Sequence, residues 1–145
     1  MKMIILCPKS SGNTYTVVKN VSERLKIEQE VINPESRIDI SKYDVLILSS
    51  GVYMDQVHKS IRNWVSNLPE ADNPQSPRFY LFMTWLGRGK SNVTAFNDLK
   101  NQLGKKGYTM DENYTDCFGK SFGVIRREHP NETDFEKIMN WIENI

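Results

Sequence analysis

The sequence predicts a three-layer, doubly wound α/β fold. Three short apolar runs lack the polar alternation of a half-exposed strand: Met3-Ile-Ile-Leu-Cys7, Asp44-Val-Leu-Ile-Leu48 and Phe79-Tyr-Leu-Phe-Met83. Runs of this kind are typical of central strands that are covered on both faces. An amphipathic segment follows each run, and strands that alternate with helices imply right-handed crossovers and a parallel sheet between two helical layers.

Four helices are predicted from apolar residues at helical spacing. Their apolar positions are Val17, Val18, Val21 and Leu25; Val57, Ile61, Trp64, Val65 and Leu68; Val93, Phe96, Leu99 and Leu103; and Phe135, Ile138, Met139 and Ile142. The last helix has a start signal, because Pro130 precedes it and Thr133-x-x-Glu136 fits a capping box.

The segments between these elements carry weaker signals. A short strand is expected near Glu30 to Ile32, and the stretch before Tyr43 is too short for a sizeable helix. The segment from Leu68 to Pro77 contains three prolines and is expected to be a surface connection.

Length and composition indicate one globular domain spanning residues 1–145. Hydrophobic residues make up 39% and charged residues 26% of the chain, which excludes disordered and collagen-like classes. The formal charge of +1 is too balanced for a protein whose main partner is nucleic acid. The longest apolar run falls far short of the roughly 18 residues that span a bilayer. We therefore expect a soluble, cytoplasmic protein without a membrane span.

The two cysteines, Cys7 and Cys117, lie far apart in the sequence and form no C-x-x-C pair. Neither a disulfide framework nor a metal site is therefore predicted. Both side chains are expected to be reduced thiols, with Cys7 buried in its strand.

Ligands of open parallel sheets bind beyond the carboxyl ends of the strands. The first such loop, Pro8-Lys-Ser-Ser-Gly-Asn-Thr14, runs from an apolar strand into an amphipathic helix. Its amides, the positive end of the helix dipole and the hydroxyls of Ser10, Ser11 and Thr14 could converge on a phosphate monoester. The alternative is that these residues only form a turn and cap the helix.

Several phosphate-binding motifs are absent. The only Gly-Lys-Ser is Gly89-Lys90-Ser91, and a P-loop requires a glycine five positions before Gly89, where this chain has Thr84. No G-x-G-x-x-G follows the first strand, so the dinucleotide-binding motif is absent too. A phosphatase loop of the C-x5-R type that begins at Cys7 would need arginine where Asn13 stands. A receiver domain needs carboxylates at strand ends where this chain has Cys7 and Ser49-Ser50.

Four segments in order resemble the flavodoxin family. Ser11-Gly-Asn-Thr14 is similar to its [ST]-x-T-G-x-T phosphate loop, with Lys9 at the leading hydroxyl position. Asp44 to Tyr53 resembles the third strand and first flavin loop, and Phe82 to Gly89 resembles the fourth strand and second flavin loop. His129-Pro-Asn-Glu-Thr-Asp134 is similar to a G-H-P-x-x-x-D segment before the final helix.

The resemblance implies a five-stranded parallel sheet of order 2-1-3-4-5 and a noncovalently bound FMN. Tyr53 and Trp85, each placed just past a strand, would flank the isoalloxazine ring, and no catalytic or metal-binding residue is implied. The implied cofactor-binding residues are Lys9, Ser10, Ser11, Gly12, Asn13 and Thr14; Ser50, Gly51, Val52, Tyr53 and Met54; and Thr84, Trp85, Leu86, Gly87, Arg88 and Gly89.

The resemblance further implies an electron-transfer protein that exchanges electrons with redox partner proteins. Two alternatives stay open: a small FMN-dependent oxidoreductase of the quinone or protoporphyrinogen type, and a partner-binding module with weak flavin affinity. His58, at a predicted helix start, is either a proton donor to a substrate or a capping residue. His129 is assigned no chemistry.

Charge near the second flavin loop departs from the acidic character of the family. Residues 86–107 hold five cations and one carboxylate, a local balance of +4: Arg88, Lys90, Lys100, Lys105 and Lys106 against Asp98. Positive charge favours the anionic hydroquinone, so we expect a less negative hydroquinone couple than in acidic flavodoxins.

Overall fold

The computed structural model describes residues 1–71, 76–121 and 123–145, and a parallel sheet forms its centre. The sheet has the order β2-β1-β3-β5-β6. Its strands are β1 (Met3–Cys7), β2 (Glu28–Val31), β3 (Val45–Tyr53), β5 (Arg78–Trp85) and β6 (Thr115–Phe118). A two-residue strand, β4 (Gln56–Val57), pairs antiparallel with the end of β3. Counting the parallel strands alone gives 2-1-3-4-5, so the predicted fold class and strand order are confirmed.

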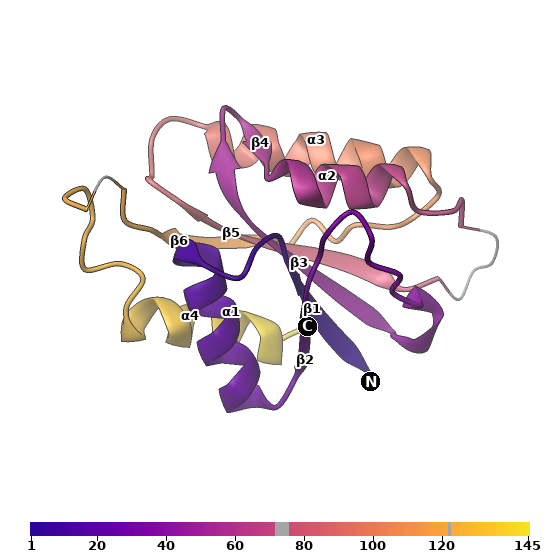
Figure 1. Ribbon diagram of the computed structural model, residues 1–145, viewed down its shortest axis with the longest axis horizontal. Helices are drawn as coiled ribbons and strands as arrows, with labels where there is room; N and C mark the ends of the chain where they lie inside the picture. Colours follow the sequence, from indigo (N-terminus) through magenta and orange to yellow (C-terminus); the bar gives the residue numbers. More distant parts are fainter. Residues whose placement is uncertain (72–75, 122) are drawn as a thin grey trace.

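Helices cover both faces of this sheet (Figure 1). α1 (Gly12–Leu25) and α4 (Glu132–Glu143) lie on one face, and α2 (Lys59–Ser66) and α3 (Ser91–Lys105) lie on the other. A short 3-10 helix, Ile40–Lys42, precedes β3. The four predicted helices are therefore all present, but Val57, which was assigned to the second helix, lies in β4, and Leu68 lies beyond the end of α2.

Each helical layer has its own hydrophobic core. Ile4 and Leu6 pack with residues of α2 and α3, whereas Ile5 and Cys7 pack with residues of α1 and α4. Successive residues of a strand point to opposite faces, so a strand buried on both faces needs apolar residues at every position. This is the physical reason for the unbroken apolar runs in the sequence.

Two strands extend further than the apolar pattern indicated. β3 continues to Tyr53 and β5 continues to Trp85, where polar residues follow the apolar run. Ladder pairing between β3 and β5 holds these ends in extended conformation, with Ser50 opposite Met83 and Gly51 opposite Thr84. Tyr53 and Trp85 are thus the last residues of their strands. The sequence had instead suggested that both lie in loops just past the strands.

The predicted capping box of the last helix is wrong by two residues. The helix begins at Glu132 with Asn131 as its N-cap, so Thr133 is already inside the first turn. The amide of Asp134 donates to Asn131 Oδ1 at 3.3 Å, and the amide of Asn131 donates to Asp134 Oδ2 at 2.8 Å. Asn and Asp make the same reciprocal pair that the pattern assigned to Thr and Glu.

Three smaller predictions have mixed outcomes. The weak second strand spans Glu28–Val31, so it begins two residues before the predicted Glu30. Val93 was assigned to the apolar face of α3 but is 38% exposed. The described parts of the predicted connection from Leu68 to Pro77 contain no helix or strand, and its residues 72–75 lie outside the described residues.

Candidate functional site

A cavity of about 270 Å³ lies at the carboxyl edge of the sheet. The loops and strand ends after β1, β3, β5 and β6 line it, because the carboxyl ends of parallel strands meet at one edge. Its lining residues are Lys9, Gly12, Asn13, Thr14, Gly51, Val52, Tyr53, Thr84, Trp85, Leu86, Gly119, Lys120 and Ser121. The structure thus brings ten of the seventeen sequence-predicted residues together.

The first wall of the cavity is the N-terminal end of α1. Its N-cap residue, Ser11, makes no side-chain capping hydrogen bond, and the first turn has no acidic residue. The amides at this end therefore keep their partial positive charge. Lys9 extends over the turn, since a Cβ at Gly12 would lie 3.4 Å from its Cε and 3.8 Å from its Nζ. Amide dipoles and an ammonium group together suit an anion.

Gly12 and Thr14 also line this end of the cavity. Gly12 has a φ of 91°, which favours glycine, and its missing side chain leaves the amides open. The buried hydroxyl of Thr14 lies 2.8 Å from the hydroxyl of Thr84 and hydrogen-bonds with it. This bond ties the start of α1 to the end of β5.

The second and third walls are the ends of β3 and β5. Tyr53 is 46% exposed, and its hydroxyl lies above Gly51, where a Cβ would come within 2.8 Å of that oxygen. Trp85 is partly exposed, but its indole Nε1 is buried and has no hydrogen-bond partner among the described residues. Such an unpaired donor beside a cavity is what a ligand acceptor can satisfy.

The other predicted residues lie around or behind the cavity. Ser50 is fully buried, and its hydroxyl donates to Gly51 O at 2.6 Å and accepts from the amide of His58 at 2.7 Å. Met54 is 97% exposed in the turn before β4. Ser10 and Ser11 precede α1 on its exposed side, and Gly87, Arg88 and Gly89 form the outer part of the loop after β5.

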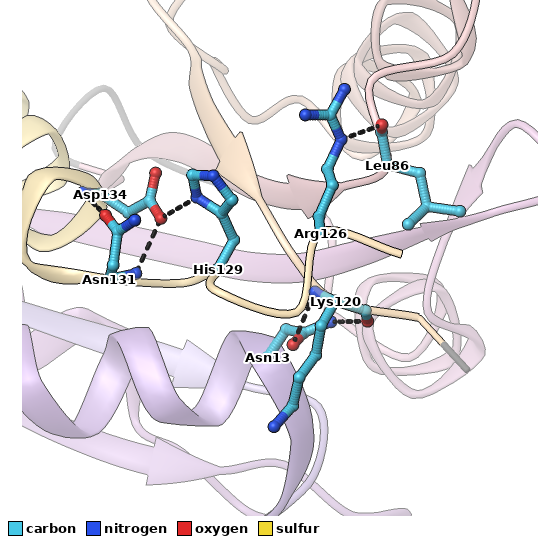
Figure 2. Close-up of polar contacts among 7 residues, drawn as sticks. All are labelled: Asn13, Leu86, Lys120, Arg126, His129, Asn131 and Asp134. Carbon is cyan, nitrogen blue, oxygen red and sulfur yellow. Dashed lines mark hydrogen bonds and ion pairs between the residues drawn. The ribbon is translucent and has the colours of Figure 1, made fainter. Parts of the chain in front are cut away.

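A fourth wall, Gly119 to Ser121, was missed from the sequence. The preceding strand, Thr115–Phe118, is half polar, so no apolar run marked it or the loop behind it. Asn13 holds this loop with two bonds: its Nδ2 donates to Lys120 O at 2.8 Å, and its Oδ1 accepts from the amide of Lys120 at 3.2 Å (Figure 2). Gly119 is required there, since a Cβ would lie 2.5 Å from Asn13 Nδ2.

Arg126 ties the same segment to the loop after β5. Its Nε donates to Leu86 O at 2.7 Å (Figure 2). Its guanidinium lies 3.7 Å from the ring centre of Phe118. Gly87 fits against this pair, because a Cβ there would lie 2.6 Å from Phe118 Cε1 and 3.1 Å from an Arg126 terminal nitrogen. The outer cavity wall is therefore packed and not a loose loop.

His129 and the two cysteines have structural environments. His129 Nδ1 lies 2.7 Å from the carboxylate of Asp134, which is also part of the α4 cap (Figure 2). Burial raises the pKa of the Cys7 thiol, and burial followed by the charge of Asp134 raises the pKa of Cys117 to about 12. Neither thiol is a thiolate at neutral pH, so the assignment of Cys7 as a buried structural residue holds.

The positive charges of residues 86–107 do not all lie near the cavity, which corrects the sequence-based count. Lys100 pairs with Glu112, and Lys106 Nζ donates to the carbonyls of Ser66 and Leu68 at 2.8 and 2.9 Å. Lys105 is in the last turn of α3, about 20 Å along the helix from its start. Only Arg88 and Lys90 remain at the carboxyl edge, where Lys9, Lys120 and Arg126 join them.

His58 caps α2, which was one of the two interpretations of this residue from the sequence. Its Nδ1 accepts from the amide of Ser60 at 3.0 Å, which requires that this nitrogen carry no proton. Burial lowers the pKa of His58, and the nearby cations Lys9, Lys59 and Arg62 lower it further. The imidazole is thus neutral at pH 7 and occupied as a cap.

Because this cap requires an unprotonated Nδ1, its contribution to the free energy of unfolding depends on pH. The folded-state pKa of His58 lies below its unfolded value of about 6.5, so its contribution is complete above about pH 7 and is lost as the pH falls below that value. We expect the free energy of unfolding of the wild type to fall relative to that of His58→Asn between about pH 7 and 5, since asparagine caps without titrating. Urea unfolding at several pH values measures this, and parallel curves for the two proteins would contradict it.

A doubly wound sheet of this strand order, with its cavity at the switch point between β1 and β3, defines the flavodoxin-like fold class. Solved structures agree. A flavodoxin from the domain Archaea is 15% identical, covers 99% of this chain and 98% of its own, and has a TM-score of 0.61. The Trp repressor binding protein of Bacillus subtilis is 16% identical over 97% of each chain, with a TM-score of 0.68. An NADPH-quinone reductase of P. pentosaceus is 8% identical, covers 99% of this chain and 97% of its own, and has a TM-score of 0.70.

The chain therefore has the flavodoxin-like fold that the sequence resemblance implied. Its sequence is also 26% identical over 153 residues to an uncharacterized protein of Methanocaldococcus jannaschii, covering 100% of this chain and 98% of that protein. No protein-family model matches the chain. Within the described residues, no helix is long and apolar enough to cross a membrane, and no cluster of three or more His, Cys, Asp and Glu side chains could hold a metal ion.

Proposed function

We propose that the protein binds FMN in the cavity at the carboxyl edge and serves as an electron-transfer protein between redox partners. The observation that carries the proposal is one cavity with an anion-binding end and an aromatic end. The start of α1, which has no side-chain cap and no acidic residue, forms the anion-binding end together with Lys9. Tyr53 and Trp85 form the aromatic end. Several proteins of the same fold are flavodoxins.

The anion-binding end fits the phosphate of FMN. The open amides at the start of α1 would donate to phosphate oxygens, and Lys9 would add a charge-assisted contact. The hydroxyl pair of Thr14 and Thr84 lies at the floor of this end. No carboxylate among the described residues lines the cavity, so nothing there repels a dianion.

The aromatic end fits a flat ring with a polar edge. Tyr53 and Trp85 supply aromatic surface, and Gly51 leaves room for the Tyr53 ring to lie against the backbone. The unpaired Nε1 of Trp85 offers a donor, and the outer loop from Leu86 to Gly89 offers backbone groups at the cavity edge. FMN, when bound, supplies the reversible uptake of electrons, and these residues bind it, orient it and exclude water from its faces.

Lys9→Gln tests the phosphate contact. Loss of the ammonium group is expected to weaken FMN binding about tenfold, the size of one charge-assisted hydrogen bond, while riboflavin binding stays unchanged because riboflavin lacks the phosphate. Quenching of flavin fluorescence during titration measures both affinities. Lys19→Gln, an exposed lysine on the outer side of α1, is the matched control and should bind both flavins like the wild type.

Two results would contradict the proposal. Absence of FMN binding by the wild-type protein overturns the proposed function itself. Equal affinity of the wild type for FMN and riboflavin overturns only the assignment of the α1 end as the phosphate site.

A second candidate is a small FMN-dependent oxidoreductase, favoured by the fold shared with an NADPH-quinone reductase. His58 was the sequence-based candidate for a proton donor in such an enzyme, but its Nδ1 is occupied by the Ser60 amide. Steady-state turnover of a quinone with a nicotinamide donor distinguishes this enzyme from an electron carrier.

A further inference from the structure

Five exposed cations surround the mouth of the cavity and form a basic rim. These residues are Lys9, Arg88, Lys90, Lys120 and Arg126. They come from the loops after β1, β5 and β6, which meet at the carboxyl edge of the sheet. Lys9 and Lys120 line the cavity itself, and Arg126 lies beside Gly87, next to Arg88 in the chain.

The cations of the basic rim are free of ion pairs within the described chain. The salt bridges found there involve other basic residues: Arg24, Arg78, Lys100, His129 and Lys137. Asp116, at the end of the sheet beside the rim, is already engaged by Asn92 at 3.0 Å and Lys137 at 3.7 Å. Of the nearby exposed carboxylates, Glu128 follows Arg126 with the exposed Arg127 between them, and Asp55 lies in the turn after β3, so positive charge prevails at the rim.

Two helix ends add to this positive charge. α1 and α3 both begin at the carboxyl edge, and neither has a side-chain capping bond or an acidic residue in its first turn. The unpaired amides of each end carry a partial positive charge of roughly half a unit. α4, by contrast, has a capping box and two acids in its first turn.

The whole chain carries a formal charge of only +1, so the rest of the molecule balances the rim. Subtracting the five rim cations from +1 leaves −4 for all other residues. The rim is therefore a local concentration of positive charge on a chain that is nearly neutral as a whole. Local charge of this kind steers an approaching charged protein before contact.

Arg126 is held in place to receive a carboxylate. Its Nε is bonded to Leu86 O, and its guanidinium stacks on Phe118, as Figure 2 shows for the first of these contacts. Its two terminal nitrogens make no hydrogen bond or ion pair among the described residues. An arginine whose rotamer is already fixed loses less side-chain entropy when it binds a carboxylate in a bidentate pair.

Exposed apolar side chains lie at the same edge. Five large hydrophobic residues are exposed in the described chain, and three of them belong to the loops and strand ends around the cavity: Tyr53, Met54 and Val124, at 46%, 97% and 71% exposure. Aromatic, methionine and arginine side chains are enriched where proteins bind one another. The rim therefore combines charge with apolar contact area, which suits a protein partner better than a small anion.

We propose that the basic rim docks an acidic face of a partner protein over the mouth of the cavity. The inference rests on the proposed function in one respect, because the partner would exchange electrons with the flavin held there. With FMN bound, Lys9 would face the phosphate, so the positive charge offered to the partner comes from the other rim residues: Arg88, Lys90, Lys120 and Arg126.

Binding to a plant-type [2Fe–2S] ferredoxin, a small acidic redox protein, tests the proposal. Isothermal titration calorimetry gives the Kd without any flavin signal, and we expect it to rise at least tenfold between about 20 and 200 mM NaCl, as for an interface steered by charge. Lys90→Glu at the start of α3 is expected to weaken binding about tenfold at low salt. Lys105→Glu at the other end of the same helix changes net charge equally and should bind like the wild type.

The remaining outcomes overturn the proposal. Absence of ferredoxin binding at low salt, equal binding by the two lysine variants, or tighter binding of the basic protein cytochrome c would each do so. A separate FMN titration of the wild type decides the proposed function. Failure of flavin binding is thereby distinguished from failure of docking.

Discussion

Gly87→Ala is expected to destabilise the protein by about 3 kcal/mol and to weaken FMN binding at least tenfold. Gly87 has a φ of 81°, a left-handed conformation that costs a residue with a side chain roughly 1–2 kcal/mol. The new Cβ would also lie 2.6 Å from Phe118 Cε1, and overpacking of this kind costs about 1–3 kcal/mol. Relief of the contact would move Phe118 and Arg126, which form the outer cavity wall.

Gly89→Ala separates these two costs. Gly89 lies in the same loop and also has a positive φ, 61°, but nothing lies within 4 Å of the position its Cβ would take. It should therefore show only the conformational cost and bind FMN nearly like the wild type. Urea unfolding and FMN titration of both variants measure the difference. Equal losses in the two would show that the packing of Phe118 against the loop contributes nothing.

Phe82→Ala is expected to lower the free energy of unfolding by about 4 kcal/mol. Phe82 is fully buried in β5, and its ring makes an edge contact with Trp141 of α4 at 6.3 Å between centres. Removing a large side chain from a close-packed core costs about 3–5 kcal/mol, through lost burial and the cavity left behind. Domains of this size are stable by about 5–15 kcal/mol, so the variant would remain folded only marginally.

Val93→Ala provides the comparison for the core substitution. The sequence pattern placed Val93 on the buried face of α3, but the structure leaves it 38% exposed. A change at such a position should alter stability by less than about 0.5 kcal/mol. A loss near that of a core residue at Val93, or a loss under about 1.5 kcal/mol at Phe82, would contradict the assignment of the two cores.

The fold could be predicted because burial on both faces constrains the sequence of each central strand separately. β1, β3 and β5 each need apolar side chains on both faces, so their sequences show it without knowledge of their neighbours. β2 and β6, in which three and two of four residues are polar, lie at the edges of the sheet, where fewer positions are buried. That weaker demand is why β2 was placed two residues late and β6 was not located.

The candidate site was predicted in part for a similar reason. The loop from Lys9 to Thr14 could be recognised because its amides, hydroxyls and glycine are consecutive in the chain. The wall from Gly119 to Ser121 is held at the site by contacts that are distant in sequence: Asn13 bonds to Lys120, 107 positions away, and the amide of Gly119 donates to Trp85 O. No local pattern records a contact of that kind.

The distribution of charge most clearly separates the features that the sequence predicts from those that depend on the tertiary structure. The fold class, the loop from Lys9 to Thr14 and the excess of positive charge after β5 can be predicted from the sequence alone. The position of that charge depends on the fold, because a helix of 15 residues carries Lys105 and Lys106 away from the cavity while Lys120 and Arg126 return to it from a later loop. Local burial and turn chemistry are encoded in neighbouring residues, whereas a binding surface is assembled from chain segments that only folding brings together.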